Sequence, residues 1–147
     1  MNIVNSFKNA FARMEQKHWN YIYILIDIHG TIFVPSYHSH EDYLFYPYAK
    51  ECLQLLSKIK NIKIILWSCT KRPWFNDYYD ILEKNNIHVD YCNENPEVVV
   101  EETDPDSLSF DEKFYYNVGL DDKFGFEPNV DWKDIYEYLI NNFNLNK

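Results

Sequence analysis

Glycine is scarce in this sequence, with three residues in 147, and proline adds only six. Long disordered linkers are usually rich in both residue types, so these counts argue against such a linker. Hydrophobic residues make up 46% of the chain and aromatic residues 18%. A chain of about this length buries about 70% of the surface that it exposes when unfolded. The composition therefore predicts one folded core that needs no disulfide or structural metal.

Cysteine is limited to Cys52, Cys69 and Cys92. The number is odd and no pair has C-x-x-C spacing, which argues against a disulfide framework and a zinc knuckle. The sequence also has no run approaching 18 apolar residues, and no apolar N-terminal run followed by a cleavage site. We therefore expect a cytoplasmic protein that does not associate with membranes.

Basic residues are outnumbered, with 14 Lys and Arg against 23 Asp and Glu, which gives a net charge of −9 and a pI of about 4.9. Nucleic-acid backbones are bound mainly through Lys and Arg, so general nucleic-acid binding is not expected. An acidic protein can still bind phosphate when a divalent cation supplies the positive charge.

The apolar pattern alternates between short continuous runs and helical stripes. The runs predict strands at 21–26, 62–67, 87–91 and 115–120, and the stripes predict helices at 43–59, 73–84 and from Asp131 onward. We interpret residues 93–109 as a loop. Alternating strands and helices predict an α/β fold, a three-layer doubly wound sandwich with a mainly parallel central sheet. The segment from Ser68 to Lys113 has no room for a folded cap domain.

An amphipathic helix is predicted at 3–17, ahead of the main fold. We interpret residues 1–20 as an N-terminal helical extension and residues 21–147 as the core domain. Core packing is the favoured role of this helix, although its apolar face also offers a surface for a homodimer.

Polar residues follow directly after three predicted strands, namely Asp27, Ser68 and the pair Asp121 and Asp122. In parallel α/β sheets, ligands bind at the carboxyl ends of the strands. These side chains, separated by about 40 and 50 residues along the chain, are therefore expected to meet in one crevice.

The same positions resemble the motifs of the haloacid dehalogenase superfamily. Its first motif, an apolar strand followed by Asp-x-Asp-x-Thr, is similar to Leu25 through Thr31, and its second is similar to the strand ending at Ser68. Its fourth motif, a strand ending in an acidic pair, is similar to Val118 through Asp122. The resemblance covers residues 21–140 and looks closest to short, capless bacterial members. It implies the superfamily's Rossmann-like fold.

The resemblance implies a Mg²⁺-dependent phosphohydrolase that acts through an aspartyl-phosphate intermediate on a phosphorylated substrate of unknown identity. Asp27 would be the nucleophile, Ser68 would donate a hydrogen bond to the phosphoryl group, and Lys113 would neutralise charge. Lys71 or Lys123 could replace Lys113 in this role. The metal ligands implied are Asp27, Asp121, Asp122 and the backbone carbonyl of His29. Substrate contacts are expected from Gly30, Thr31, Cys69, Lys71 and Arg72.

His29 departs from the family pattern, because the family has its general acid, an Asp, at this position. Histidine can also transfer protons near neutral pH. Two hypotheses therefore remain: a phosphohydrolase, weak in activity, that uses His29 as its acid, and a catalytically impaired relative that acts as a binding or interaction protein.

Two other segments of the sequence contain possible metal ligands. Asp27-Ile28-His29-Gly30 also looks like the first motif of dinuclear metallophosphoesterases, but the later Gly-Asn segment of those enzymes is absent. The run from His38 to Asp42 could bind a metal separately, although a polar loop is the simpler interpretation.

Overall fold

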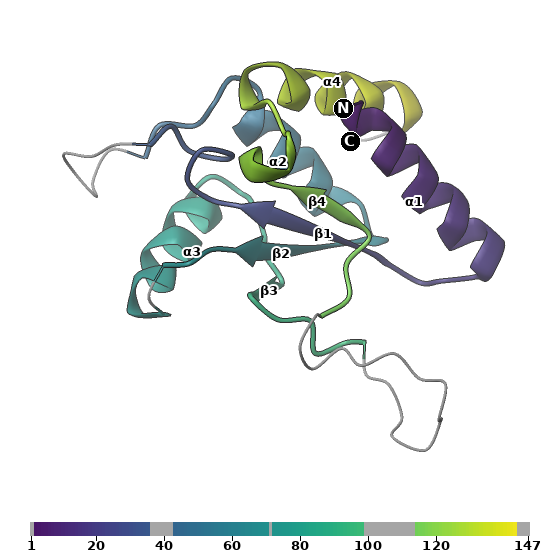
Figure 1. The fold of residues 1–147 in the computed structure, drawn as a ribbon, viewed down its shortest axis with the longest axis horizontal. Coiled ribbons are helices and arrows are strands. Elements are labelled where there is room, and N and C mark those ends of the chain that lie inside the picture. Colours follow the sequence, from purple (N-terminus) through teal and green to yellow (C-terminus); the bar gives the residue numbers. More distant parts are fainter. Residues whose placement is uncertain (1, 36–42, 71, 99–113, 144–147) are drawn as a thin grey trace.

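The computed structural model describes residues 2–35, 43–70, 72–98 and 114–143. Within these ranges four strands form one sheet in the order β3-β2-β1-β4, and each neighbouring pair is parallel (Figure 1). The strands are β1 (Ile22–Asp27), β2 (Ile62–Trp67), β3 (Tyr91–Cys92) and β4 (Val118–Leu120). The helices are α1 (Ile3–Lys17), α2 (Ala49–Lys58), α3 (Phe75–Lys84) and α4 (Pro128–Asn142), with 3₁₀ turns η1 (Arg72–Trp74) and η2 (Asp122–Phe124).

The predicted α/β fold with a parallel central sheet is confirmed. β1 and β2 pair over their whole length, from Ile22 opposite Ile62 to Asp27 opposite Trp67. Both strands are mainly apolar, with Lys63 and Asp27 as exceptions, as expected for central strands that are covered on both faces. No cap domain occurs among the described residues. No described helix has the length and apolar character needed to cross a membrane.

Helices α1, α2 and α4 cover one face of the sheet (Figure 1). The even-numbered residues of β1 and β2 point to this face and join helix side chains in the main core cluster. Trp132 of α4 is the largest fully buried side chain in that cluster. Ile3, Phe7 and Ala10 of α1 are buried there too, so the apolar face of α1 is used within the chain.

The opposite face is covered by aromatic residues from segments outside the helices. Tyr23, Leu25 and Ile65 form a second core cluster on this face. The partly buried side chains that pack on it are Tyr91, Val98, Phe114, Tyr115 and Tyr116. Residues 93–98, at the start of the predicted loop, form no helix or strand.

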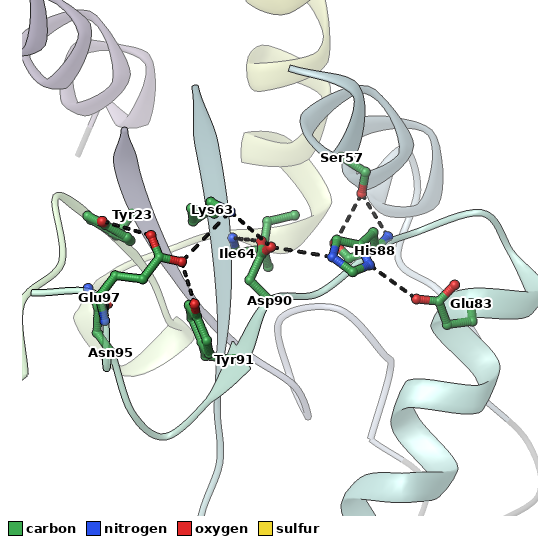
Figure 2. Close-up of polar contacts among 10 residues, drawn as sticks. All are labelled: Tyr23, Ser57, Lys63, Ile64, Glu83, His88, Asp90, Tyr91, Asn95 and Glu97. Carbon is green, nitrogen blue, oxygen red and sulfur yellow. Dashed lines mark hydrogen bonds and ion pairs between the residues drawn. The ribbon is translucent and has the colours of Figure 1, made fainter. Parts of the chain in front are cut away.

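A polar network lies on this second face, at the end of β1 and β2 where the strands begin (Figure 2). Lys63 Nζ lies 3.8 Å from Asp90 and 3.7 Å from Glu97. Glu97 also accepts hydrogen bonds from the hydroxyls of Tyr23 and Tyr91. The carboxylates in this network thus have a cation and hydroxyl donors beside them, which is how buried or half-buried charges are normally stabilised.

Two predicted strands are shorter in the structure, because side chains replace backbone carbonyls as hydrogen-bond acceptors. The predicted strand at 87–91 is paired only at Tyr91–Cys92, since the Ile64 N–H donates to the Asp90 side chain, 2.8 Å away. The predicted strand at 115–120 begins at Val118, since the Tyr23 N–H donates to the Asn117 side chain, 2.8 Å away.

The last helix begins at Pro128 rather than after Asp131. Asp131 lies in the first turn of α4. Its side chain accepts a hydrogen bond, at 2.7 Å, from the N–H of Glu127, the residue before the helix. Proline is favoured at the first helical position because its missing N–H would have no partner there. The two shorter helices also start later than predicted, α2 at Ala49 and α3 at Phe75, with Pro73 lying in η1.

Candidate functional site

Three carboxylates meet at the carboxyl edge of the sheet. Asp27 is the last residue of β1, and Asp121 follows directly after β4. One oxygen from each of Asp27, Asp121 and Asp122 lies within 4.8 Å of the other two. The carboxylates that were expected to converge from strands far apart in the sequence therefore do lie together, while Ser68 is not part of this cluster.

Thr31 links the two segments that carry these carboxylates. Its hydroxyl donates to Asp27 Oδ2 at 3.1 Å and accepts from the Asp122 N–H at 3.3 Å. Its carbonyl accepts from the indole N–H of Trp132 at 2.7 Å. Thr31 is fully buried, so this hydroxyl has no competing water and holds one orientation of Asp27.

Gly30 approaches the carboxylate of Asp122 more closely than another residue could. Its φ is +82°, a conformation that residues with a side chain rarely adopt. A Cβ at this position would lie 3.0 Å from Asp122 Oδ2. The turn after Asp27 therefore depends on glycine for its backbone angle and for the space beside Asp122.

Gly30→Ala is expected to lower the free energy of unfolding by more than about 1 kcal/mol, because the methyl group adds backbone strain and displaces Asp122. Chemical denaturation measures the change. Gly119→Ala is the matched control, since Gly119 has no positive φ and the nearest atom to its Cβ would be a side-chain atom of Tyr116 at 3.3 Å. Equal stability of Gly30→Ala and wild type would contradict the need for glycine.

His29 is exposed and lies against a buried tyrosine. Its Nε2 is 2.6 Å from the hydroxyl of Tyr78, and the two rings meet edge to face. The same hydroxyl lies 3.5 Å from Thr70 Oγ1, which accepts from Ser68 Oγ at 2.8 Å. A chain of polar groups therefore connects His29, after β1, with Ser68, after β2.

Ser68 is held in place by the side chain of Asn93. The Asn93 amide accepts from the Ser68 N–H at 2.9 Å and donates to the Ser68 carbonyl at 2.8 Å. Asn93 has a φ of +56°, a left-handed conformation that asparagine tolerates better than most residues. It follows β3 directly, so three neighbouring strand ends contribute to the arrangement around Ser68.

Burial and mutual repulsion shape the electrostatics of the carboxylates. Burial, followed by the charge of Asp121, raises the pKa of Asp27 from its usual 3.8 to about 6, although the hydrogen bond from Thr31 opposes this rise. Burial also raises the pKa of Asp121, while the hydrogen bond from the Lys123 N–H opposes the rise. Among the described residues, no ion pair is formed by the three carboxylates, in contrast to the network around Lys63.

The donor set suits a small, hard divalent cation. Mg²⁺ prefers carboxylate oxygens at about 2.0–2.1 Å, which places bound oxygens about 3–4 Å apart. Three oxygens within 4.8 Å of one another need only small side-chain movements to reach that spacing. Asp27, Asp121 and Asp122 could therefore hold Mg²⁺, and the positive charge would offset their repulsion.

The remaining predicted site residues are only partly described. Cys69 is exposed, and Lys123 is exposed in η2, beside the acidic pair. Arg72 begins η1. Lys71, Lys113 and the run from His38 to Asp42 lie outside the described residues.

Neither Tyr78 nor Asn93 could be identified as a site residue from its local sequence. Tyr78 belongs to the buried stripe of α3, where an aromatic residue is expected to pack in the core. Its contact with His29 spans 49 positions of the chain. Asn93 lies at the start of a polar loop, in a position where Asn is common in turns.

The comparisons with known proteins bear on the fold. A solved structure described as that of the conserved protein coded by a locus of Bacteroides thetaiotaomicron is 25% identical to this chain, with a TM-score of 0.60. The similarity covers 85% of this chain and 94% of that chain, and the description names no activity. No protein-family model and no curated protein matches the chain.

Proposed function

We propose that this chain is a Mg²⁺-dependent phosphohydrolase of the haloacid dehalogenase type, with Asp27 as its nucleophile. The observation that carries the proposal is the convergence of Asp27, Asp121 and Asp122 at the carboxyl edge of a parallel sheet. Three carboxylates held this closely repel one another, and a fold tolerates such repulsion most readily where a cation relieves it. The resemblance of the strand-end motifs to that superfamily supports the same conclusion.

The proposed reaction has two steps. A carboxylate oxygen of Asp27 attacks phosphorus, the bond to the leaving oxygen breaks, and His29 supplies a proton to that oxygen. In the second step His29 takes a proton from water, which attacks the phosphorus of the aspartyl phosphate and releases inorganic phosphate. When bound, Mg²⁺ supplies the positive charge that allows an anionic carboxylate to approach an anionic phosphate.

The other residues would bind and orient. Thr31 fixes the Asp27 carboxylate through its hydroxyl. Ser68, held at its backbone by Asn93, would turn its hydroxyl proton from Thr70 to the phosphoryl group. Tyr78 would fix the ring of His29 through the bond to Nε2. Lys113 stays the predicted source of positive charge on the transferring group. The cytoplasmic location and a homodimer also stay predictions.

Release of phosphate from 4-nitrophenyl phosphate tests the proposal. We expect turnover with Mg²⁺ that EDTA abolishes and added Mg²⁺ restores. A dinuclear metallophosphoesterase would instead need two transition metals per chain and would be inactive with Mg²⁺ alone. That alternative is less well supported, because the metal-ligating cluster found among the described residues contains three carboxylates and no histidine ring.

The second candidate is a catalytically impaired relative that binds phosphorylated ligands. The observation that favours it is the commitment of His29 Nε2 to Tyr78, since a ring placed for packing need not transfer protons. The variant His29→Asp distinguishes the phosphohydrolase from the binding protein. An inert wild type with an active His29→Asp variant would identify a binding protein that has lost its acid.

A further inference from the structure

Trp67 lies beside the proposed nucleophile on the neighbouring strand. It is the register partner of Asp27, and paired residues of parallel strands point to the same face of the sheet. That face is the one occupied by Leu25 and Ile65, two residues earlier in each strand. Adjacent strands are about 4.8 Å apart, so Trp67 leaves β2 at the position beside Asp27. Trp67 is nevertheless 38% exposed.

Phe124 lies on the same face, on the other side of β1. Gly119 of β4 pairs with Leu25, and a Cβ built on Gly119 would lie 3.3 Å from Cε2 of Tyr116 and 3.7 Å from Cδ2 of Phe124. The rings of Tyr116 and Phe124 therefore both cover β4 where a side chain is missing. Phe124 is 50% exposed, and it is only two residues from Asp122. Two exposed aromatic residues thus flank the strand that ends in Asp27.

The indole of Trp67 packs against other aromatic rings of the chain. Its ring centroid lies 5.5 Å from that of Phe114, and Phe114 lies 6.5 Å from Tyr116. Phe114 and Tyr116 pack on the second core cluster. A large aromatic ring that is fixed in place and still exposed next to a polar site can stack on a ligand at little cost in side-chain entropy.

We propose that Trp67 and Phe124 bind a planar aromatic or heteroaromatic ring carried by the phosphate ester whose phosphate lies at Asp27. This inference rests on the proposed function, because it takes the phosphate position from it. Trp67 lies one strand away from Asp27, so a ring stacked on it would belong to a short ester rather than a long one. The net charge of −9 and the three nearby carboxylates favour an uncharged ring over a second anionic group. The substrate class is therefore a small monoester such as a nucleoside monophosphate.

A matched pair of esters tests the inference. Adenosine 5′-monophosphate and ribose 5-phosphate share the same leaving oxygen, so their kcat/KM values differ through the base and not through intrinsic reactivity. Stacking of one base contributes enough binding for about a 10-fold preference or more. We expect wild type to prefer the nucleotide by that factor, and Trp67→Ala or Trp67→Leu to bring the ratio close to one. Trp67→Phe should keep part of the preference for the nucleotide.

Tyr21→Ala is the control, because Tyr21 has a similar exposure of 37% but precedes β1, at the opposite end of the strand. It should leave the ratio unchanged. Calorimetric binding of hydrolysis-resistant phosphonate analogues of the two esters separates this inference from the proposed function. Equal affinities for the two analogues would overturn the stacking site even in an active enzyme. A preference for the nucleoside analogue in a protein without turnover would support the stacking site and contradict the hydrolase.

Discussion

Asp27→Asn should lower kcat for 4-nitrophenyl phosphate by at least about 10³-fold at saturating Mg²⁺, because an amide cannot replace the attacking carboxylate. The variant keeps the size of the side chain and can still accept the hydrogen bond from Thr31. Loss of turnover would therefore reflect loss of the nucleophile and not of the local fold. Initial rates across a Mg²⁺ titration measure the effect and separate it from weaker metal binding.

Asp134→Asn is the matched control, since it makes the same chemical change on the exposed surface of α4. It should retain wild-type kcat. Circular dichroism should show the same secondary structure in both variants. Full turnover by Asp27→Asn would exclude Asp27 as the nucleophile, whatever the fold and the other carboxylates suggest.

The position of the acidic site could be predicted because it depends on strand ends. β1 and β2 are six residues long and mainly apolar, with Asp27 ending β1 and Ser68 following β2. Parallel strands place all such ends at one edge, so Asp27 and Asp121 had to be close once the sheet was correctly ordered. No knowledge of loops or side-chain packing was needed for that step.

The hydrogen bonds that position the site residues could not be predicted in the same way. The bond from Trp132 to Thr31 spans 101 positions and the bond between Tyr78 and His29 spans 49. Each of these aromatic residues also fits a core position of its helix, which is the simpler interpretation of the sequence. Periodicity identifies which residues are buried, but it does not show where a polar atom at the tip of a buried ring finds its partner.

The short strands illustrate the same limit. Asp90 and Asn117 use their side chains to accept hydrogen bonds that a backbone carbonyl would accept in a regular ladder. Asp and Asn compete with the backbone in this way, which is one reason why both are depleted in strands. The apolar pattern around them predicted longer strands, because it carries no information on which polar group takes each bond.

Without metal, the protein should become less stable as the pH rises from about 4 to about 6. The folded-state pKa of Asp27 is raised from its usual 3.8 to about 6. The folded state therefore binds the Asp27 proton more tightly than the unfolded state does. The stabilisation from this proton is fully present below pH 3.8 and is lost as the pH passes through about 6. Denaturation in EDTA across this range measures the loss.

The size of this effect sets the expectation for Asp27→Asn. A pKa difference of this kind corresponds to about 3 kcal/mol when the group is fully shielded from water, and we expect about half of that because Asp27 is only partly buried. Metal-free Asp27→Asn should therefore be more stable than wild type at pH 7.5 by about 1–2 kcal/mol. A variant that is less stable than wild type in EDTA would show that burial and the charge of Asp121 do not destabilise the ionised Asp27 in the folded state.

Magnesium should reverse the order of stability. A ligand at 100 times its Kd stabilises the folded state by about 2.7 kcal/mol, which raises Tm by roughly 5–10 °C in a domain of this size. We expect this shift for wild type at pH 7.5, and a smaller shift at pH 5, where protons compete with the metal for Asp27. Asp27→Asn should lose most of it. Because the same carboxylate destabilises the empty fold and is proposed to bind the metal, the two measurements should change in opposite directions in one variant, and a purely structural cluster would not produce that pattern.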